Sequence, residues 1–309
     1  MTEQGHTPHR SAMLEAGKKA QAIVLHYFAA VRGEAAEVDM GKAWKSEHPH
    51  DVVTHADREA QDIIERTLLA AFPDYAFYAE ENGRHIAVPP KHEGVRRFVV
   101  DPIDGTHNFT NGIPDFSIAI AVQEFRRGAW ENLAGLVMLP AHGEVYYAEG
   151  GRVADFRGKE EVIQVCHPEA KPKDLPPHEI LHFVQDDMKG VHGIPVEDAI
   201  YAYSSGDFQA AVLRFRGLLA EAGGIARKSY STAQRLAEIA RGRVEGVIVG
   251  GDYYEWDVAA GLAIAEQSGA TILQREDFGL KVIVAAASPA LAHAIEAVWA
   301  ESVHAPVER

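Results

Sequence analysis

The chain has few of the features that mark secreted or membrane proteins. Its single cysteine, Cys166, cannot form an internal disulfide. No continuous apolar run approaches the roughly 18 residues that a membrane-spanning helix needs, and the polar first ten residues resemble no secretory signal. We therefore expect a cytoplasmic protein without membrane spans. The hydrophobic content of 47% in 309 residues is enough for a large core, in one unit or in two packed halves.

The sequence also lacks basic clusters. Asp and Glu number 45 against 30 Lys and Arg, which gives a formal net charge of -15. This surplus argues against nucleic acid or an anionic membrane as a partner. It would also repel small anions in general, unless bound metal ions reverse the local field. Most of the acidic residues are expected to solvate the surface.

The most informative segment is residues 101–109, Asp-Pro-Ile-Asp-Gly-Thr-His-Asn-Phe. The preceding residues 97–100 predict a short buried strand, and Pro102 and Gly105 predict a turn just beyond it. Backbone N–H groups of such a turn can point at an anion, while Asp101 and Asp104 can hold hard cations above it. Taken alone, both aspartates could be ordinary turn formers.

Apolar spacing predicts an α/β protein. The expected helices cover residues 11–31, 57–72, 207–222, 231–241, 257–267 and 289–303. Strands at 98–101, 116–124, 133–139 and 144–149 should form an antiparallel meander. Further strands are expected at 199–204, 225–230, 244–249, 271–274 and 282–286.

The predicted elements suggest two halves. Residues 1–165 would form a metal-binding α+β half and residues 199–309 an α/β half that carries Asp257. Residues 166–198 are rich in proline and are expected to be a loop or insertion. They contain four histidines, but only His178 and His182 have helical ligand spacing and no further cysteine supports them, so we do not expect a zinc site.

Residues 101–109 resemble the signature of the inositol monophosphatase family of magnesium-dependent phosphatases. Three further segments follow the family's order and spacing, namely residues 51–57, 80–81 and 256–261. The resemblance runs from about residue 11 to about residue 300 and is weakest between 150 and 200. It implies the layered α/β fold of inositol monophosphatases and fructose-1,6-bisphosphatases, with alternating layers of helices and sheets, and it implies a homodimer.

The resemblance also implies a metal site with two or three Mg²⁺ ions. Their ligands would be the carboxylates of Glu80, Asp101, Asp104 and Asp257 and the carbonyl oxygen of Ile103. Without the resemblance, Glu80 and Glu81 could be a solvated acidic pair. Asp257 could likewise be a plain helix cap, because aspartate is a favoured residue at that position.

A catalytic pair is implied as well. Asp57 would bond to Thr106, and together with Glu80 this pair would help to activate the attacking water. Gly105 and Thr106 would offer backbone N–H groups to the phosphate, and the helix that begins at Asp257 would direct its positive end towards it. Residues 54–57 also predict a capping box. Lys45 is a candidate for the lysine on the family's mobile loop.

Two departures leave the substrate open. Gly250 stands where inositol-specific enzymes have a ring-binding glutamate, and the bulky Tyr230 falls where the family has small residues. The leading hypothesis is a phosphomonoesterase for a small polyol or sugar phosphate, with inositol monophosphate first. Histidinol phosphate, fructose 1,6-bisphosphate and 3'(2'),5'-bisphosphorylated nucleotides are rivals. A hypothesis of another class is a regulatory protein that binds a macromolecular partner and keeps a vestigial phosphatase site.

Overall fold

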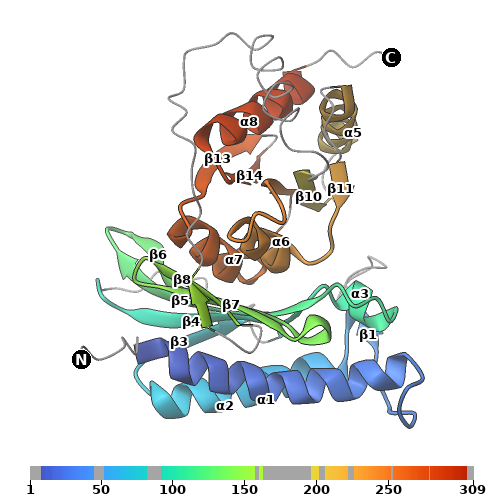
Figure 1. Ribbon diagram of the computed structural model, residues 1–309, viewed down its shortest axis with the longest axis vertical. Coiled ribbons are helices and arrows are strands. Elements are labelled where there is room, and N and C mark those ends of the chain that lie inside the picture. Colours follow the sequence, from blue (N-terminus) through green and yellow to red (C-terminus); the bar gives the residue numbers. More distant parts are fainter. Residues whose placement is uncertain are drawn as a thin grey trace. The chain divides into compact units, whose positions relative to one another are not determined.

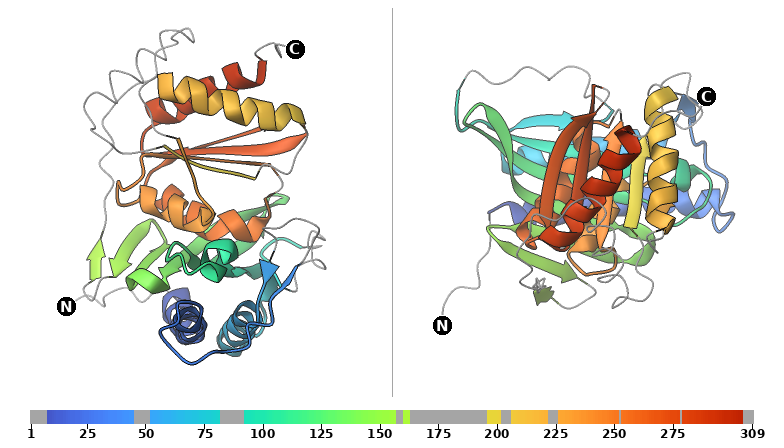
Figure 2. Two further views of the ribbon diagram at one scale, coloured as in Figure 1. Left: turned by 90° about the vertical axis from the view of Figure 1, so that its right-hand side faces the viewer. Right: turned by 90° about the horizontal axis from the view of Figure 1, so that it is seen from above.

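The computed structural model describes residues 8–44, 52–81, 92–156, 160–162, 196–201, 206–221, 226–251, 253–277 and 279–304. The chain divides into two units (Figures 1 and 2). Unit 1 comprises residues 1–163, 230–237 and 255–267, and unit 2 comprises residues 164–229, 238–254 and 268–309. Lys45 lies outside the described residues, as does the expected loop or insertion up to residue 195.

Unit 1 is built on a seven-stranded sheet with the order β3-β4-β5-β6-β7-β8-β9. β3 runs parallel to β4 and every other neighbour is antiparallel. The meander predicted from residues 98–149 is thereby confirmed. The strands are β3 (Ala76–Ala79), β4 (Arg96–Asp104), β5 (Ser117–Arg126), β6 (Ala129–Leu139), β7 (Glu144–Glu149), β8 (Arg152–Phe156) and β9 (Glu160–Val162).

Two long helices, α1 (Pro8–Val31) and α2 (His55–Ala71), lie side by side on one face of this sheet (Figures 1 and 2). Both were predicted from their apolar spacing. Their buried faces and the sheet share one hydrophobic core, whose members include Met13, Val24, Ile64, Leu68, Phe98, Val100, Ile103, Phe116 and Leu136. A short antiparallel pair, β1 (Ala43–Trp44) and β2 (Val52–Val53), precedes α2. The one-turn helix α3 (Thr106–Thr110) and the 3-10 turn η2 (Pro140–His142) follow β4 and β6.

The opposite face of the sheet carries α7 (Glu255–Gln267), which packs beside the start of α6 (Thr232–Ile239). Small residues permit this close packing. A Cβ on Gly135 of β6 would lie 2.4 Å from the Ala260 carbonyl oxygen, and one on Gly261 would lie 2.6 Å from Leu236 Cβ. The contacts therefore divide the chain differently from its sequence halves, because α7 and Asp257 pack within unit 1.

Unit 2 contains a five-stranded sheet with the order β11-β10-β12-β14-β13. β10 (Val196–Tyr201) is parallel to β11 (Ala226–Lys228) and β12 (Gly246–Gly251), whereas β14 (Leu280–Ala286) is antiparallel to β12 and β13 (Thr271–Asp277). Helices α5 (Gly206–Glu221) and α8 (Pro289–His304) share a core with this sheet, formed by residues such as Phe208, Phe215, Ile248, Val284, Ile295 and Trp299.

Each unit thus combines helices with a sheet, and the predicted α/β fold class is confirmed. The predicted start of the last helix is confirmed at Pro289, where Leu291 N donates a hydrogen bond of 3.3 Å to Ser288 Oγ. Among the described residues, no helix has the length and apolar character required to cross a membrane.

Candidate active site

The centre of the site is the end of β4 and the turn that follows it. The predicted turn was placed too early, because β4 continues through Pro102 to Asp104 and the chain turns only at Gly105, with φ +94°. This φ favours glycine. A Cβ there would also lie only 3.1 Å from the carbonyl oxygen of Tyr230 and 3.2 Å from that of Asp115. Conformation and space therefore both require the glycine that the motif contains.

An irregularity in β4 brings its two aspartates to the same side. Side chains alternate along a regular strand, so residues three apart point to opposite faces. The pairing of β4 with β5 shifts register between Asp101 and Asp104, and Ile103 points into the core with α1 and α2. The shift reverses the alternation, as a β-bulge does. Both carboxylates can therefore face the site.

Asp104 is buried and bonded at both carboxylate oxygens. Its Oδ2 accepts from Ser231 Oγ (2.7 Å), Ala233 N (2.9 Å) and Ser117 Oγ (3.0 Å), and its Oδ1 accepts from Thr232 N (3.1 Å). Burial raises the pKa of Asp104 to about 6, while these hydrogen bonds act in the opposite direction. The start of α6 thus fixes this carboxylate in place.

Asp101 interacts with three other carboxylates, those of Glu80, Asp104 and Asp257. Its Oδ1 accepts a hydrogen bond of 3.0 Å from Ile103 N. Burial raises the pKa of Asp101 well above its usual range, and the negative charges of Glu80, Asp104 and Asp257 raise it further. Glu80 directly follows β3 and is held beside β4 by its N–H, which donates to Val100 O at 3.2 Å. Three predicted ligands are therefore close enough to Asp101 for their charges to repel it.

This donor set fits a hard cation in its chemistry and its charge. All the candidate donors are oxygens, which Mg²⁺ and Ca²⁺ prefer. Glu80 interacts with Asp101, yet its Oε2 atom is buried without a hydrogen-bond partner in the described structure. Among the described residues, no three His, Cys, Asp or Glu side chains are arranged closely enough to hold a metal ion. A bound cation would remove the mutual repulsion of the carboxylates.

The predicted catalytic pair is present in the geometry. Asp57 is fully buried, and its Oδ2 accepts from Thr54 N (2.8 Å) and Thr54 Oγ1 (2.6 Å) at the start of α2. Its Oδ1 lies 3.3 Å from Thr106 Oγ1, which also lies 3.0 Å from Ile103 O. The capping-box prediction is therefore confirmed, and the same carboxylate contacts Thr106.

The remaining predicted residues lie near helix starts. Gly105 and Thr106 occupy the N-terminal end of α3. Asp257 belongs to the first turn of α7, but that helix begins at Glu255, so the alternative reading of Asp257 as a plain N-terminal cap is wrong. The rings of His107 and Tyr230 pack next to Gly105 with their centroids 5.1 Å apart. Gly250 lies in β12 of unit 2, where a Cβ would come within 3.2 Å of Phe208 Cζ.

Sequence reasoning missed the residues that hold the carboxylates. Ser117 and Ser231 both bond to Asp104, and the N–H groups at the start of α6 join them. The position of Ser231 at the start of the predicted helix 231–241 was a usable signal, because helix starts bind anions and a carboxylate of the same chain is one. Arg97 was also missed, although a charge inside a buried strand, four residues before Asp101, requires a partner.

The sequence and the structure of this chain are similar to those of one family of known proteins. The model of the inositol monophosphatase family matches residues 7–305. A Mesorhizobium japonicum protein named inositol-1-monophosphatase is 32% identical over 227 residues, which cover 72% of this chain and 71% of that protein. A histidinol-phosphatase of Chlorobaculum parvum is 36% identical over 152 residues, 49% of this chain and 52% of that one. The solved structure of a Thermotoga maritima IMPase superposes with a TM-score of 0.64 at 26% identity, covering 94% of this chain and 96% of that one.

Proposed function

Since the chain belongs to the inositol monophosphatase family and is a phosphoric monoester hydrolase, we propose that it hydrolyses a small polyol or sugar phosphate with the help of Mg²⁺. The lead substrate is inositol monophosphate. The observation that carries the proposal is the gathering of Glu80, Asp101, Asp104 and Asp257 beside the glycine turn. Asp101 and Asp104 are buried and the other two are half-buried, so these charges of one sign are costly unless a cation compensates them.

The proposed metal ligands are the four carboxylates and the Ile103 carbonyl oxygen. Two or three bound Mg²⁺ ions would supply positive charge for the phosphate oxygens and lower the pKa of a bound water. The protein's own part is to hold these oxygens in place. Asp104 is fixed by the start of α6 and retains acceptor capacity at Oδ1, which has a single hydrogen bond. Asp101 is fixed through Ile103 N.

Thr106 and Asp57 provide a path for the proton of the attacking water. The Thr106 hydroxyl has one proton, which it can donate either to Ile103 O or to Asp57 Oδ1. Were the Ile103 oxygen engaged by a cation, the Thr106 proton would be directed to Asp57, and the Thr106 oxygen could then accept a hydrogen bond from water. As this water attacks phosphorus, its proton passes to Thr106 while the Thr106 proton passes to Asp57. The bond to the ester oxygen breaks with its electron pair, and the leaving oxygen takes a proton from solvent water to give the alcohol.

The turn beyond Asp104 is proposed to hold the phosphate. Backbone N–H groups of Gly105 and Thr106 at the start of α3, and the positive end of α7 at Asp257, would contact the phosphate oxygens. The strict space limit at Gly105 supports this role, because a side chain there would alter the turn that presents these groups.

A second candidate substrate is histidinol phosphate. Gly250 replaces the ring-binding glutamate, and the contact of its position with Phe208 leaves little space for a side chain. The His107 and Tyr230 rings lie next to the phosphate turn, where a planar leaving group can stack on them. A relative also carries the name histidinol-phosphatase.

Phosphate release from a panel of esters tests the proposal. The panel contains inositol monophosphates, histidinol phosphate, fructose 1,6-bisphosphate, adenosine 3',5'-bisphosphate and glycerol phosphate, each with Mg²⁺ and with chelator. We expect turnover of inositol monophosphate that requires Mg²⁺ and is lost in Asp101→Asn. Turnover of histidinol phosphate alone would select the second candidate. Equal turnover with chelator, or none for any ester despite measurable Mg²⁺ binding, would contradict the proposal.

The family resemblance also supports a cytoplasmic homodimer as a proposal. Light scattering on the purified full chain measures its mass directly. A mass near twice the 33.7 kDa of one chain would agree with the proposal, and a single-chain mass would reject the dimer.

A further inference from the structure

Strand β4 presents different side chains to the two helical layers of unit 1. Phe98 and Val100 point into the core with α1 and α2. Because side chains alternate along the strand, Arg97 and Asp101 lie on the other face, which is the face that α7 covers. A buried arginine and a proposed metal ligand are thus directed at the same helix, four residues apart.

Arg97 has a fully defined environment. Its Nη2 donates to Glu255 Oε2 at 2.5 Å and its Nε donates to Gln123 Oε1 at 2.9 Å. The guanidinium lies 3.8 Å from the ring centroid of Trp130 and 5.0 Å from that of Tyr78. The side chain is only 4% exposed, whereas that of Glu255 is 34% exposed. Arg97 is therefore a fixed charge inside the protein, and its ionic partner is the first residue of α7.

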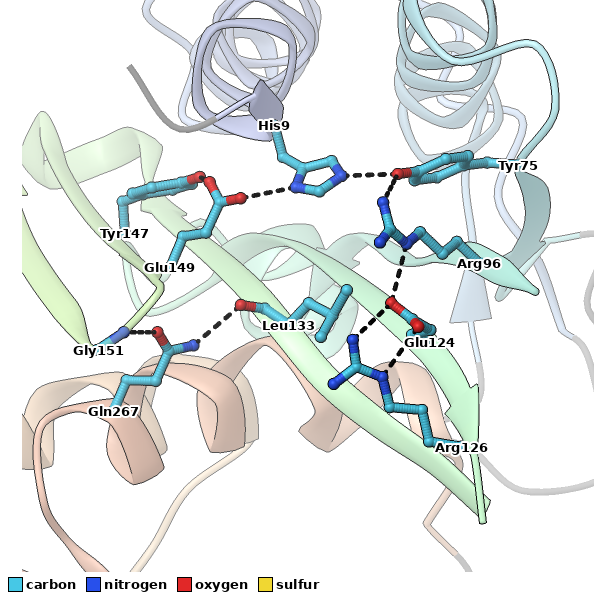
Figure 3. A network of polar contacts seen from close by, with 10 residues as sticks. All are labelled: His9, Tyr75, Arg96, Glu124, Arg126, Leu133, Tyr147, Glu149, Gly151 and Gln267. Atoms are coloured by element: carbon cyan, nitrogen blue, oxygen red, sulfur yellow. Dashed lines mark hydrogen bonds and ion pairs between the residues drawn. The ribbon is translucent and has the colours of Figure 1, made fainter. Parts of the chain in front are cut away.

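Elsewhere along α7, Glu266 bonds to Asn132 of β6, and several further contacts with the sheet involve uncharged groups. At its C-terminal end, Gln267 bonds to Leu133 O (3.2 Å) and to Gly151 N (3.0 Å), as Figure 3 shows. In its middle, the backbone of Ala260 packs on Gly135. At the N-terminal end, the negative charges of Asp257 and Asp101 repel each other. The ion pair of Arg97 with Glu255 opposes this repulsion two residues away from it.

We propose that Arg97 is a positioning residue for the reaction. Through Glu255 it holds the first turn of α7 on β4, and this keeps the Asp257 carboxylate beside Asp101 before a cation binds. The inference rests on the proposed function, because the position of Asp257 affects the reaction through the metal that Asp257 would hold. Loss of a residue that orients a metal ligand typically weakens metal affinity or activity by about 10- to 100-fold.

The test compares two neighbouring arginines. Arg97→Met removes the charge and keeps an unbranched side chain under Trp130. Arg96→Met is the matched control, because Arg96 lies on the other side of the same strand and bonds to Tyr75 and Glu124 (Figure 3). Each variant is assayed for the Mg²⁺ concentration at half-maximal rate, the kcat and ester KM at saturating Mg²⁺, and the calorimetric Mg²⁺ affinity.

For Arg97→Met we expect both the half-maximal Mg²⁺ concentration and the dissociation constant for Mg²⁺ to rise about tenfold or more. Saturating Mg²⁺ should restore kcat to within a few-fold of the parent value, and the ester KM should stay unchanged. Arg97→Lys, which keeps a charge within reach of Glu255, should recover most of the lost affinity. Arg96→Met should leave all these constants unchanged, even if it lowers the thermal midpoint.

Three results would overturn the inference. The first is an unchanged Mg²⁺ affinity in Arg97→Met while the parent hydrolyses its ester. That result would leave the proposed function intact and reject only the positioning role of Arg97. The second is an equal loss of affinity in Arg96→Met, which would indicate a general stability effect. The third is obtained without metal or substrate, and therefore holds even if the proposed function fails. If hydrogen exchange in the first two turns of α7 is no faster in Arg97→Met than in the parent, Arg97 does not hold that helix end.

Discussion

Unit 1 contains two groups of charged side chains that follow opposite rules. The first, here called the mixed network, consists of His9, Tyr75, Arg96, Glu124, Arg126, Tyr147 and Glu149, and joins α1 to the sheet (Figure 3). The second, here called the carboxylate cluster, consists of Glu80, Asp101, Asp104 and Asp257. In the mixed network each acid bonds to an arginine or histidine side chain, whereas the donors to Asp101 and Asp104 in the cluster are hydroxyl and backbone N–H groups.

The pKa shifts of two carboxylates on paired strands express this difference. Hydrogen bonds from Arg126 and Arg96 lower the pKa of Glu124 in β5. Burial and three neighbouring carboxylates raise the pKa of Asp101 in β4. A balanced group of charges stabilises the fold, and an unbalanced one is retained at a cost in stability. The comparison teaches that an excess of negative charge, rather than burial or charge alone, distinguishes the proposed site from the mixed network.

The largest expected effect comes from neutralising one member of the carboxylate cluster. Asp101→Asn should lower the rate at saturating Mg²⁺ by about 10³-fold or more, roughly 4 kcal/mol, because a proposed metal ligand is lost. The same variant should be more stable than the parent in chelator, by about 1 kcal/mol, because one of the repelling charges is gone. Kinetics and denaturant unfolding measure the two effects.

Glu124→Gln in the mixed network is the matched control for Asp101→Asn. It should lower stability by about 1 kcal/mol, since the pKa of Glu124 is shifted towards its charged form, and leave the rate nearly unchanged. If Asp101→Asn kept near-normal turnover, or if both variants lost stability equally, the distinction between the two groups would fail.

The next largest effect is expected at Thr106. Thr106→Val keeps the shape of the side chain and removes the hydroxyl that bonds to Asp57 or Ile103. We expect kcat to fall by about 10²-fold, the lower range for general acid–base groups, with a nearly unchanged Mg²⁺ requirement. Thr106→Ser should retain most of the activity. Thr110→Val, which loses only a bond to His107 O in the same helix, should behave like the parent, and a matching loss there would refute the specific role of Thr106.

A smaller effect, confined to stability, is expected in the mixed network. Glu149 accepts from His9 Nδ1 at 2.7 Å and from the Tyr147 hydroxyl. Glu149→Gln should lower the free energy of unfolding by about 1 to 3 kcal/mol, because a charged acceptor of buried donors is lost. Turnover of the folded protein at low temperature should not change. A selective loss of kcat without a loss of stability would show that this network also serves the reaction.

The smallest effect is a pH dependence of Mg²⁺ stabilisation. The pKa of Asp104 is about 6 in the folded protein, and that of Asp101 is raised as well, so the folded state binds more protons than the unfolded state above about pH 4. In chelator, these groups therefore destabilise the fold as pH rises from about 4 through 6 and beyond. Mg²⁺ binds the charged carboxylates and removes this penalty.

Thermal unfolding between about pH 5 and about pH 8 checks the sign. The increase in midpoint caused by Mg²⁺ should grow with pH in the parent. In Asp101→Asn it should be small at every pH. An increase that shrinks towards high pH would mean that other groups control Mg²⁺ binding.

Much of this architecture could be predicted because the signals are local. The apolar period of α1, α2 and α8 fixed their limits to within a few residues, and the meander followed from apolar runs separated by turn residues. Strand β3 was not predicted, because its four residues are too few to show a period. Yet β3 is the strand that places Glu80 beside β4.

Other parts of the site depend on contacts that no local pattern encodes. The register shift that turns Asp101 and Asp104 to one side exists only in the pairing of β4 with β5. The bonds from Ser231 and Thr232 to Asp104 join residues more than a hundred positions apart. Arg97 finds its partner Glu255 across 158 positions. The motif thus predicted the proposed ligands. It did not predict the contacts that hold them in position.

Calorimetric titration of Mg²⁺ into the metal-free protein tests the central claim most directly. The claim is that the carboxylate cluster exists to bind cations, and burial raises the pKa of one member, Asp104, to about 6. The account predicts Mg²⁺ binding that releases protons at about pH 6, releases fewer at about pH 8, and is strongly weakened in Asp101→Asn but not in Glu124→Gln. Mg²⁺ binding of equal strength in the parent and Asp101→Asn, or no binding in either, would contradict it.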